Sequence, residues 1–259
     1  MVPRRFSHAI ILLVVFAAAT VVVALPRVSQ DPAYHAFADR RTMFGVPNAL
    51  NVLSNIAFLL AGGFGLWVLR DRGRAGSMFA GVPATQARRA FAALFAGTLL
   101  AGFGSAYYHL APDNARLVWD RLPMTIGFMG LLTAIVGERV GARPARVLFV
   151  PLLAVSAFSV AYWGWTEARG AGDLRPYGLV QFGSLTIVLL MLPLYRSSQA
   201  GTAYLVAALT AYGAAKLCEA FDVDIFSIGE VISGHTLKHL AAAIGLGIVA
   251  LMLRRRATC

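Results

Sequence analysis

The sequence predicts an all-α protein, a polytopic bundle of transmembrane helices, on three observations. The chain has 259 residues, of which 58% are hydrophobic and only 14% are charged, and this is far too apolar for an ordinary soluble domain. Apolar runs close to the ~20 residues that cross a bilayer as a helix recur along its whole length. The connections between these runs are short, so they leave no room for a separate soluble domain.

The apolar runs predict eight spans. Their approximate ranges are 8–25, 49–69, 90–109, 122–138, 146–164, 177–195, 202–218 and 233–253. In the first span, Arg4 and Arg5 precede an apolar run that reaches Leu25, a pattern also typical of a signal peptide. The run is long for a signal core, and Pro26 follows it directly. We therefore expect a retained helix, with cleavage as the alternative.

Polar residues mark the second, third, fourth and eighth spans. The outer part of the second span has a group for which we expect packing and hydrogen bonds between helices: Asn48, Asn51, Ser54 and Asn55. Ser105 and His109 end the third span, Asp120 precedes the fourth, and His235 and His239 begin the eighth. The fifth, sixth and seventh spans are plain apolar runs. The acids before the last span are expected to form a solvated loop: Glu219, Asp222, Asp224 and Glu230.

Basic residues predict the orientation of the bundle. All 23 are arginine except Lys216 and Lys238, and one side of the eight-span arrangement holds the arginines of segments 4–5, 70–89, 139–146, 196 and 254–256. The opposite side holds most of the acids and fewer bases. These bases are Arg27, Arg40, Arg41, Arg116, Arg121, Arg169, Arg175 and Lys216. By the positive-inside rule, the first side is cytoplasmic and both termini point inward.

The net charge of +11 is explained by this topology and by contact with anionic lipids. No basic patch is interleaved with aromatic residues in a solvated domain, so nucleic-acid binding is not expected. The preference for arginine over lysine suggests a bacterial genome and hence an inner-membrane location. The sequence does not indicate an oligomeric state.

Five polar residues are predicted to lie at a similar depth on the outer side. Ser105 and His109 are four residues apart, as are His235 and His239, so each pair lies on one face of its helix. Asp120 joins them because the third span runs outward, the fourth begins on that side and the eighth runs inward. Ionisable groups near hydrocarbon are costly, so this coincidence indicates a function.

Metal chemistry accounts for these residue types. Neutral imidazoles are good zinc ligands, and a catalytic zinc site has three protein ligands and an open position for water. Bound zinc makes water acidic enough to form hydroxide near neutral pH. We predict that His109, His235 and His239 hold zinc, that Asp120 accepts a proton from water or fixes an imidazole, and that Ser105 stabilises a developing oxyanion. His8 and His35 are expected to have no metal role.

Less specific interpretations exist for each residue. A single membrane histidine is more often a hydrogen-bonding partner between helices than a metal ligand. Asp120 beside Arg121 could form a solvated ion pair at a helix start. It is the combination of three histidines, a carboxylate and a hydroxyl at one depth that favours a metal-dependent hydrolase.

The motifs Asn51-Val-Leu-Ser-Asn55, Gly104-Ser-Ala-Tyr-Tyr-His109, Trp119-Asp120 and Gly234-His-Thr-Leu-Lys-His239 resemble those of the alkaline ceramidases. These enzymes belong to a superfamily of seven-helix membrane hydrolases that includes the adiponectin and progestin receptors. The resemblance covers roughly residues 45–253. It implies a seven-helix zinc hydrolase core there, preceded by an additional helix and outer loop (1–44) and followed by a basic cytoplasmic tail (254–259).

The resemblance implies that His109, His235 and His239 bind zinc, that Asp120 is the general base, and that Ser105 assists near the site. The expected activity is hydrolysis of the N-acyl bond of ceramide-like membrane lipids to a sphingoid-type base and a fatty acid. Asn48 stands where animal members have a glutamate of their calcium site, so calcium regulation is not expected.

Two alternatives to this function stay open, and a third is disfavoured. Another lipid amide or ester could be the substrate, and a receptor-like protein could use the zinc structurally. An ion transporter would place ionisable residues through the middle of the bilayer, whereas here they cluster near one surface.

Overall fold

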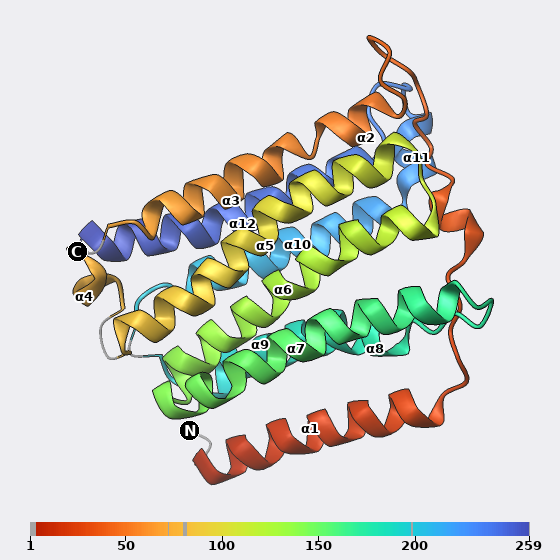
Figure 1. Ribbon diagram of the computed structural model, residues 1–259. Coiled ribbons are helices and arrows are strands. Elements are labelled where there is room, and N and C mark those ends of the chain that lie inside the picture. Colours follow the sequence, from red (N-terminus) through yellow and green to blue (C-terminus); the bar gives the residue numbers. More distant parts are fainter. Residues whose placement is uncertain (1–3, 72, 80–81, 198, 259) are drawn as a thin grey trace.

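The computed structural model describes residues 4–71, 73–79, 82–197 and 199–258, and these residues form an α-helical bundle (Figure 1). Among them no strand occurs, and the only bridge of β type joins Met43 to Val46. The predicted class, an all-α polytopic helical bundle, is confirmed.

Each of the eight predicted spans coincides with helical structure. The long segments are α1 (Arg4–Ala24), α2 with α3 (Ala49–Leu53 and Ile56–Val68), α5 (Ala84–Leu110), α6 (Asn114–Arg139), α7 (Ala142–Glu167), α8 with the π-helical turn η2 and α9 (Arg175–Gly178, Leu179–Gly183 and Ser184–Leu194), α10 (Thr202–Ala220) and α12 (Gly234–Thr258). Short helices are η1 (Pro32–His35), α4 (Ala75–Met78) and α11 (Asp222–Ser227). Among the described residues, six of the long segments are long and apolar enough to cross a membrane, and α6 and α10 pack among them with more polar sequences.

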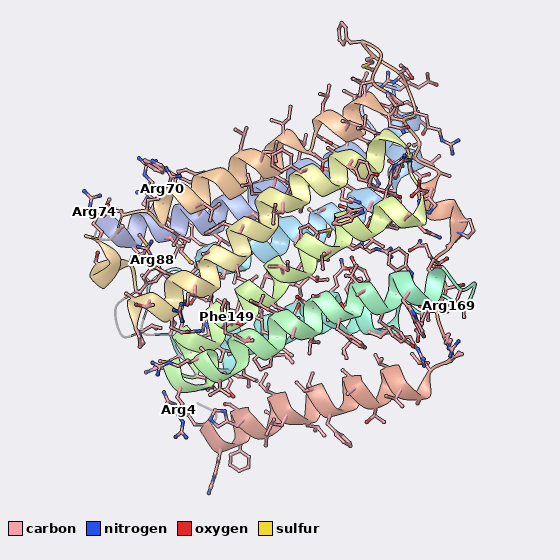
Figure 2. The ribbon with its side chains drawn as sticks, in the orientation of Figure 1. Arg4, Arg70, Arg74, Arg88, Phe149 and Arg169 are labelled. Carbon is pink, nitrogen blue, oxygen red and sulfur yellow. The ribbon has the colours of Figure 1, made fainter. Side chains whose placement is uncertain are left out.

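The long segments run antiparallel to their sequence neighbours, so the beginning of α1 and the end of α12 lie at the same end of the bundle (Figure 1). Helix α5 packs between α3 and α6, α6 also contacts α7 and α9, and α12 returns to pack between α3 and α10. In Figure 2, Arg4, Arg70, Arg74 and Arg88 lie at the end that holds both termini, whereas Arg169 lies at the opposite end. We call these the arginine-rich end and the histidine end, since the three histidines of the predicted site lie at the latter.

Helix α1 stands at the edge of the bundle beside α9 (Figure 1). Of its described residues only Ser7 is buried, and Ser7 Oγ donates to the carbonyl of Leu194 (3.1 Å). After α1 the chain is held again where the amide of Leu174 donates to the carbonyl of Val28 (2.8 Å). The additional helix is therefore fixed at its two ends and contributes little to the core.

Helices α5 and α6 approach each other closely near the histidine end. A Cβ atom at Gly104 would overlap the carbonyl oxygen of Trp119, so only glycine fits there. In a regular helix the amide of residue 123 would donate to the carbonyl of Trp119. Residue 123 of α6 is a proline, which has no amide hydrogen to donate. This close approach brings Ser105, next to Gly104, beside Asp120, next to Trp119.

Two sequence-based placements are wrong. Helix α6 begins at Asn114, well before residue 122, so Asp120 lies within the helix and not ahead of it. Arg121, counted among the charges of the outer connections, is buried in the bundle with 5% exposure. Both errors have one cause: the hydropathy of residues 114–121 resembles that of a loop, and only packing against α5 and α7 shows that the segment is helical and enclosed.

The arginine distribution makes the orientation testable by cysteine labelling after replacement of the native cysteines. We expect Ala115→Cys, exposed in the first turn of α6 at the histidine end, to react with an impermeant thiol reagent added to intact cells. Arg74→Cys, at the arginine-rich end, should react only after the membrane is opened, because arginine-rich connections stay cytoplasmic. The opposite labelling pattern would place the histidine end in the cytoplasm.

Candidate metal centre

Three histidines meet at the histidine end. His109 lies in the last turn of α5, while His235 and His239 lie in the first turns of α12, one turn apart on the same face. All three side chains are buried, and one nitrogen of each lies within 4.8 Å of the others. The group could hold a metal ion.

One pair of these nitrogens has the spacing of two ligands on a tetrahedral ion. Two nitrogens bound at zinc–nitrogen distances in a tetrahedral site lie about 3.4 Å apart. The Nε2 atoms of His109 and His235 are 3.3 Å apart, and the three imidazole rings have centroid separations of 4.8–4.9 Å. The chain supplies three ligands here, which leaves a fourth position for a small molecule, as in catalytic zinc sites.

Ser54 contacts one nitrogen of His239. Its Oγ lies 3.1 Å from the carbonyl oxygen of Asn51 and 2.8 Å from Nδ1 of His239. In the tautomer in which Nδ1 carries the proton and donates to Ser54, the lone pair is on Nε2, where a metal ion can use it.

Other polar residues fix the helices that carry the ligands. Asp222 Oδ1 accepts from the amide of His235 (2.6 Å). This amide lies in the first turn of α12, where backbone amides have no acceptor within the helix. Asn48 Nδ2 donates to the carbonyl of His109 (2.9 Å), and Asn51 Oδ1 accepts from the hydroxyl of Thr236 (2.9 Å). The expected interhelical hydrogen bonding of the asparagine-rich segment is confirmed, whereas Asp222 caps a helix and is not simply part of a solvated loop.

Asp120 and Ser105 form a buried pair beside the histidines. Ser105 lies beside Asp120 where α5 and α6 make their close approach, and both side chains are at least nine-tenths buried. Both residues line the same cavity as His239. Within the described residues no ion pair joins Asp120 to Arg121, so the solvated pair considered from the sequence does not form.

A segment before α2 covers the site, and the sequence did not indicate it. The ring centroid of Phe37 lies 4.6 Å from that of His109 and 4.5 Å from that of His235. The amide of the next residue, Ala38, donates to Asp222 Oδ2 (2.9 Å). Phe37 thereby shields the two imidazoles from water on this side.

Arg41 fastens the same segment to the connection between α11 and α12. Its guanidinium donates to the carbonyls of Glu230 (2.6 Å) and Val231 (2.8 Å) and to the Asp39 carboxylate (2.8 Å). The hydrogen bonds from Arg41 hold the pKa of the Asp39 carboxyl below its ordinary value. The ion pair between Asp39 and Arg41 is present at neutral pH and is lost as the pH falls through that lowered pKa.

Lys238 and Glu219 form a second feature that hydropathy missed. Lys238 Nζ lies 2.8 Å from Glu219 Oε1 and 3.1 Å from His235 Nε2. Glu219, expected in a solvated loop, is instead largely enclosed, and it also pairs with Lys216 and accepts from the Tyr34 hydroxyl (3.4 Å). Because His235 Nε2 has one lone pair, a bound metal ion and the Lys238 ammonium compete for it, and Glu219 provides the alternative partner for the ammonium.

A cavity of about 1300 Å³ extends from the site into the bundle. Ser105, Asp120 and His239 line it near the histidine end, and Leu246 and Val249 line it two to three turns further along α12. Most of the lining is aliphatic or aromatic, and the middle of α1 contributes part of the wall. The cavity therefore joins a polar end to a long apolar chamber.

The sequence of this chain matches no protein-family model and no curated protein. The likeness to the alkaline ceramidases consequently rests on the motifs themselves.

The centre predicts one tightly bound zinc ion per chain. Replacing His235 with Ala should remove the metal or severely lower the affinity of the site for it, because only two imidazoles remain as ligands. Ser54→Ala should weaken binding about 10- to 100-fold, the usual effect of losing a group that orients a ligand. Metal content after dialysis against graded chelator, measured by elemental analysis, tests both.

His35→Ala is the matched control for metal binding. His35 is half-buried, and its Nδ1 bonds to the Tyr108 hydroxyl and its Nε2 to Asn114 Oδ1, both at 2.8 Å, so neither nitrogen is free for an ion. We expect the His35→Ala protein to retain zinc. A fully metallated His235→Ala protein would contradict the assignment.

Proposed function

We propose that this chain is a zinc-dependent intramembrane amidase that hydrolyses the N-acyl bond of ceramide-like lipids, in the manner of the alkaline ceramidases. The observation that carries the proposal is a group of three buried histidines, one of which, His239, lines the polar end of an apolar cavity together with Asp120 and Ser105. In hydrolysis the oxygen of water bonds to the acyl carbon, the carbon–nitrogen bond breaks, and the nitrogen leaves with a proton as an amine.

The residues divide the work by their chemistry. Zinc held by His109, His235 and His239 would polarise the amide carbonyl and acidify a water molecule. Asp120 accepts the proton of the attacking water and returns it to the departing nitrogen. Ser105, which lines the cavity beside Asp120, donates to the oxygen on which negative charge develops.

Lys238 adds a cationic donor at the same end of the cavity. Its ammonium lines the cavity and is held by Glu219 at 2.8 Å. A fixed ammonium in an enclosed site stabilises negative charge on a reacting carbonyl oxygen more strongly than a solvated one would. We assign Lys238 this supporting role.

The cavity suits a substrate that enters from the bilayer. An acyl chain can occupy the apolar chamber toward Leu246 and Val249 while its amide reaches Asp120. We place the histidine end at the outer face of a bacterial inner membrane, with both termini in the cytoplasm, on the arginine distribution. Other lipid amides and esters present the same carbonyl chemistry and belong in the substrate panel.

Asp120→Asn separates the base from the ligands. The variant should keep its zinc, because no histidine is changed, but its turnover of N-acyl lipids should fall by about 10²- to 10⁴-fold, since an amide cannot accept a proton from water. Fatty acid release from a panel of lipid amides and esters and the zinc content of the same preparation are the two measurements.

Asp113→Asn is the matched control, because Asp113 caps the helix that carries Asp120 through the amide of Arg116 (2.7 Å), a bond that asparagine can replace. It should retain both zinc and activity. Loss of zinc from Asp120→Asn would make Asp120 a metal ligand, and zinc without turnover of any lipid would favour a receptor-like protein with a structural metal.

A further inference from the structure

Arg121 is a buried cation with no ion-pair partner in the part of the chain that the structure describes. Its side chain lies on α6 next to Asp120 and is 5% exposed, yet none of the ion pairs within the described residues includes it. A charge in such surroundings is costly unless other groups stabilise it. The reason for its burial is therefore to be found in what surrounds it.

Three aromatic rings hold the guanidinium in place. Its carbon lies 4.3 Å from the ring centroid of Trp163, 4.6 Å from that of Tyr177 and 5.5 Å from that of Tyr34. Cation–π contacts at these distances stabilise a guanidinium and leave its N–H groups unused. Nη2 donates to the side-chain oxygen of Gln30 (2.6 Å).

The remaining terminal nitrogen lacks an acceptor. Nη1 of Arg121 is buried and has no hydrogen-bond partner among the described residues, and the same is true of Nε1 of Trp163, whose ring lies against the guanidinium. Unpaired buried donors are rare because each costs free energy on desolvation. The surroundings of Arg121 thus offer donors and positive charge but too few acceptors.

This donor-rich position opens onto the substrate cavity. Arg121 lines the cavity together with its neighbour Asp120 and with Ser105 and Tyr34. Tyr34 contacts Arg121 on one side and donates to Glu219 on the other, so it joins the guanidinium to the ion pair that holds Lys238. An oxygen bound by Arg121 would consequently lie in the cavity that Asp120 also lines.

We propose that Arg121 forms an oxyanion-binding subsite that selects N-acyl lipids with a carboxylate or phosphate on the amine side of the amide. A guanidinium recognises both groups with paired N–H donors, and an oxyanion there would supply the acceptor that Nη1 lacks. The anionic headgroup would lie against Arg121 while the acyl chain fills the apolar chamber. This subsite deepens the proposed amidase function, and its binding arm can be tested without turnover.

Three probe lipids with one acyl chain separate the possibilities: N-palmitoylglycine carries a carboxylate, N-palmitoylethanolamine phosphate a phosphate, and N-palmitoylethanolamine is neutral. Binding is measured on zinc-loaded Asp120→Asn protein, which retains the cavity without hydrolysing the probe. We expect at least one anionic probe to bind about 10-fold more tightly than the neutral one, and the better of the two identifies the headgroup. Equal binding of all three would overturn the proposal.

Arg121→Gln, made in the same background and in the active chain, tests the residue itself. This variant should weaken binding of the preferred anionic probe by about 10- to 100-fold, the scale of a hydrogen bond to a charged group. Its affinity for the neutral probe should change less than about threefold. Arg121→Lys keeps the charge but not the paired donors, so its affinity for the anionic probe should lie between those of the parent protein and Arg121→Gln. If Arg121→Gln weakened all three probes alike and lowered the unfolding temperature, Arg121 would only tether Gln30 and Tyr34.

Arg116→Gln is the matched control. Arg116 precedes Arg121 in α6, is about one-third exposed and pairs with Asp113 at 3.1 Å. This variant should leave the binding and turnover of all three probes unchanged. Anion-selective binding that depends on Arg121 but comes without hydrolysis of any probe would reject the amidase function and retain the subsite, whereas hydrolysis without selectivity would do the reverse.

Discussion

Polar side chains inside this bundle can be stabilised only by other groups of the chain, because hydrocarbon offers them no hydrogen bonds. The ionisable residues named here accordingly gather in two layers. At the histidine end they are the three imidazoles, the Asp120–Ser105 pair and the Lys238–Glu219 pair. At the arginine-rich end, Arg256 pairs with Glu138 at 2.6 Å and Arg139 donates to the carbonyl of Tyr195 at 2.7 Å. The apolar cavity occupies the space between the layers.

The two layers differ in how completely their groups are satisfied. At the arginine-rich end, the carboxylate of Glu138 and the guanidinium of Arg256 are joined by two hydrogen bonds, which suits a structural clasp between α6 and α12. At the histidine end, Nδ1 of His109 and Nη1 of Arg121 have no partner among the described residues. At the arginine-rich end Nε of Arg139 also lacks a partner among the described residues, but its two terminal nitrogens are bonded. Unsatisfied buried groups are destabilising, and a free imidazole nitrogen and a free guanidinium nitrogen in one layer are typical of a site that binds something else.

The first 44 residues contribute to this site in two places, although the resemblance to known enzymes begins after them. The middle of α1 forms part of the cavity wall, and the segment from Gln30 to Arg41 lies over the histidines and Arg121. Phe37 excludes water from the imidazoles, and Gln30 and Tyr34 hold the guanidinium. Residues outside the resembling core therefore shape the headgroup end of the proposed substrate pocket.

The sequence by itself determined the fold class, the approximate helices and the grouping of His109, His235 and His239. Hydropathy depends on local composition, and positions four apart share a helix face whatever the tertiary packing, so these inferences needed no knowledge of distant contacts. The tertiary structure alone decided the roles of Phe37, Glu219, Lys238 and Arg121. Glu219 and Arg121 resemble loop charges in the sequence, and they become site residues only because segments far apart in the chain enclose them and replace the water that a loop would provide.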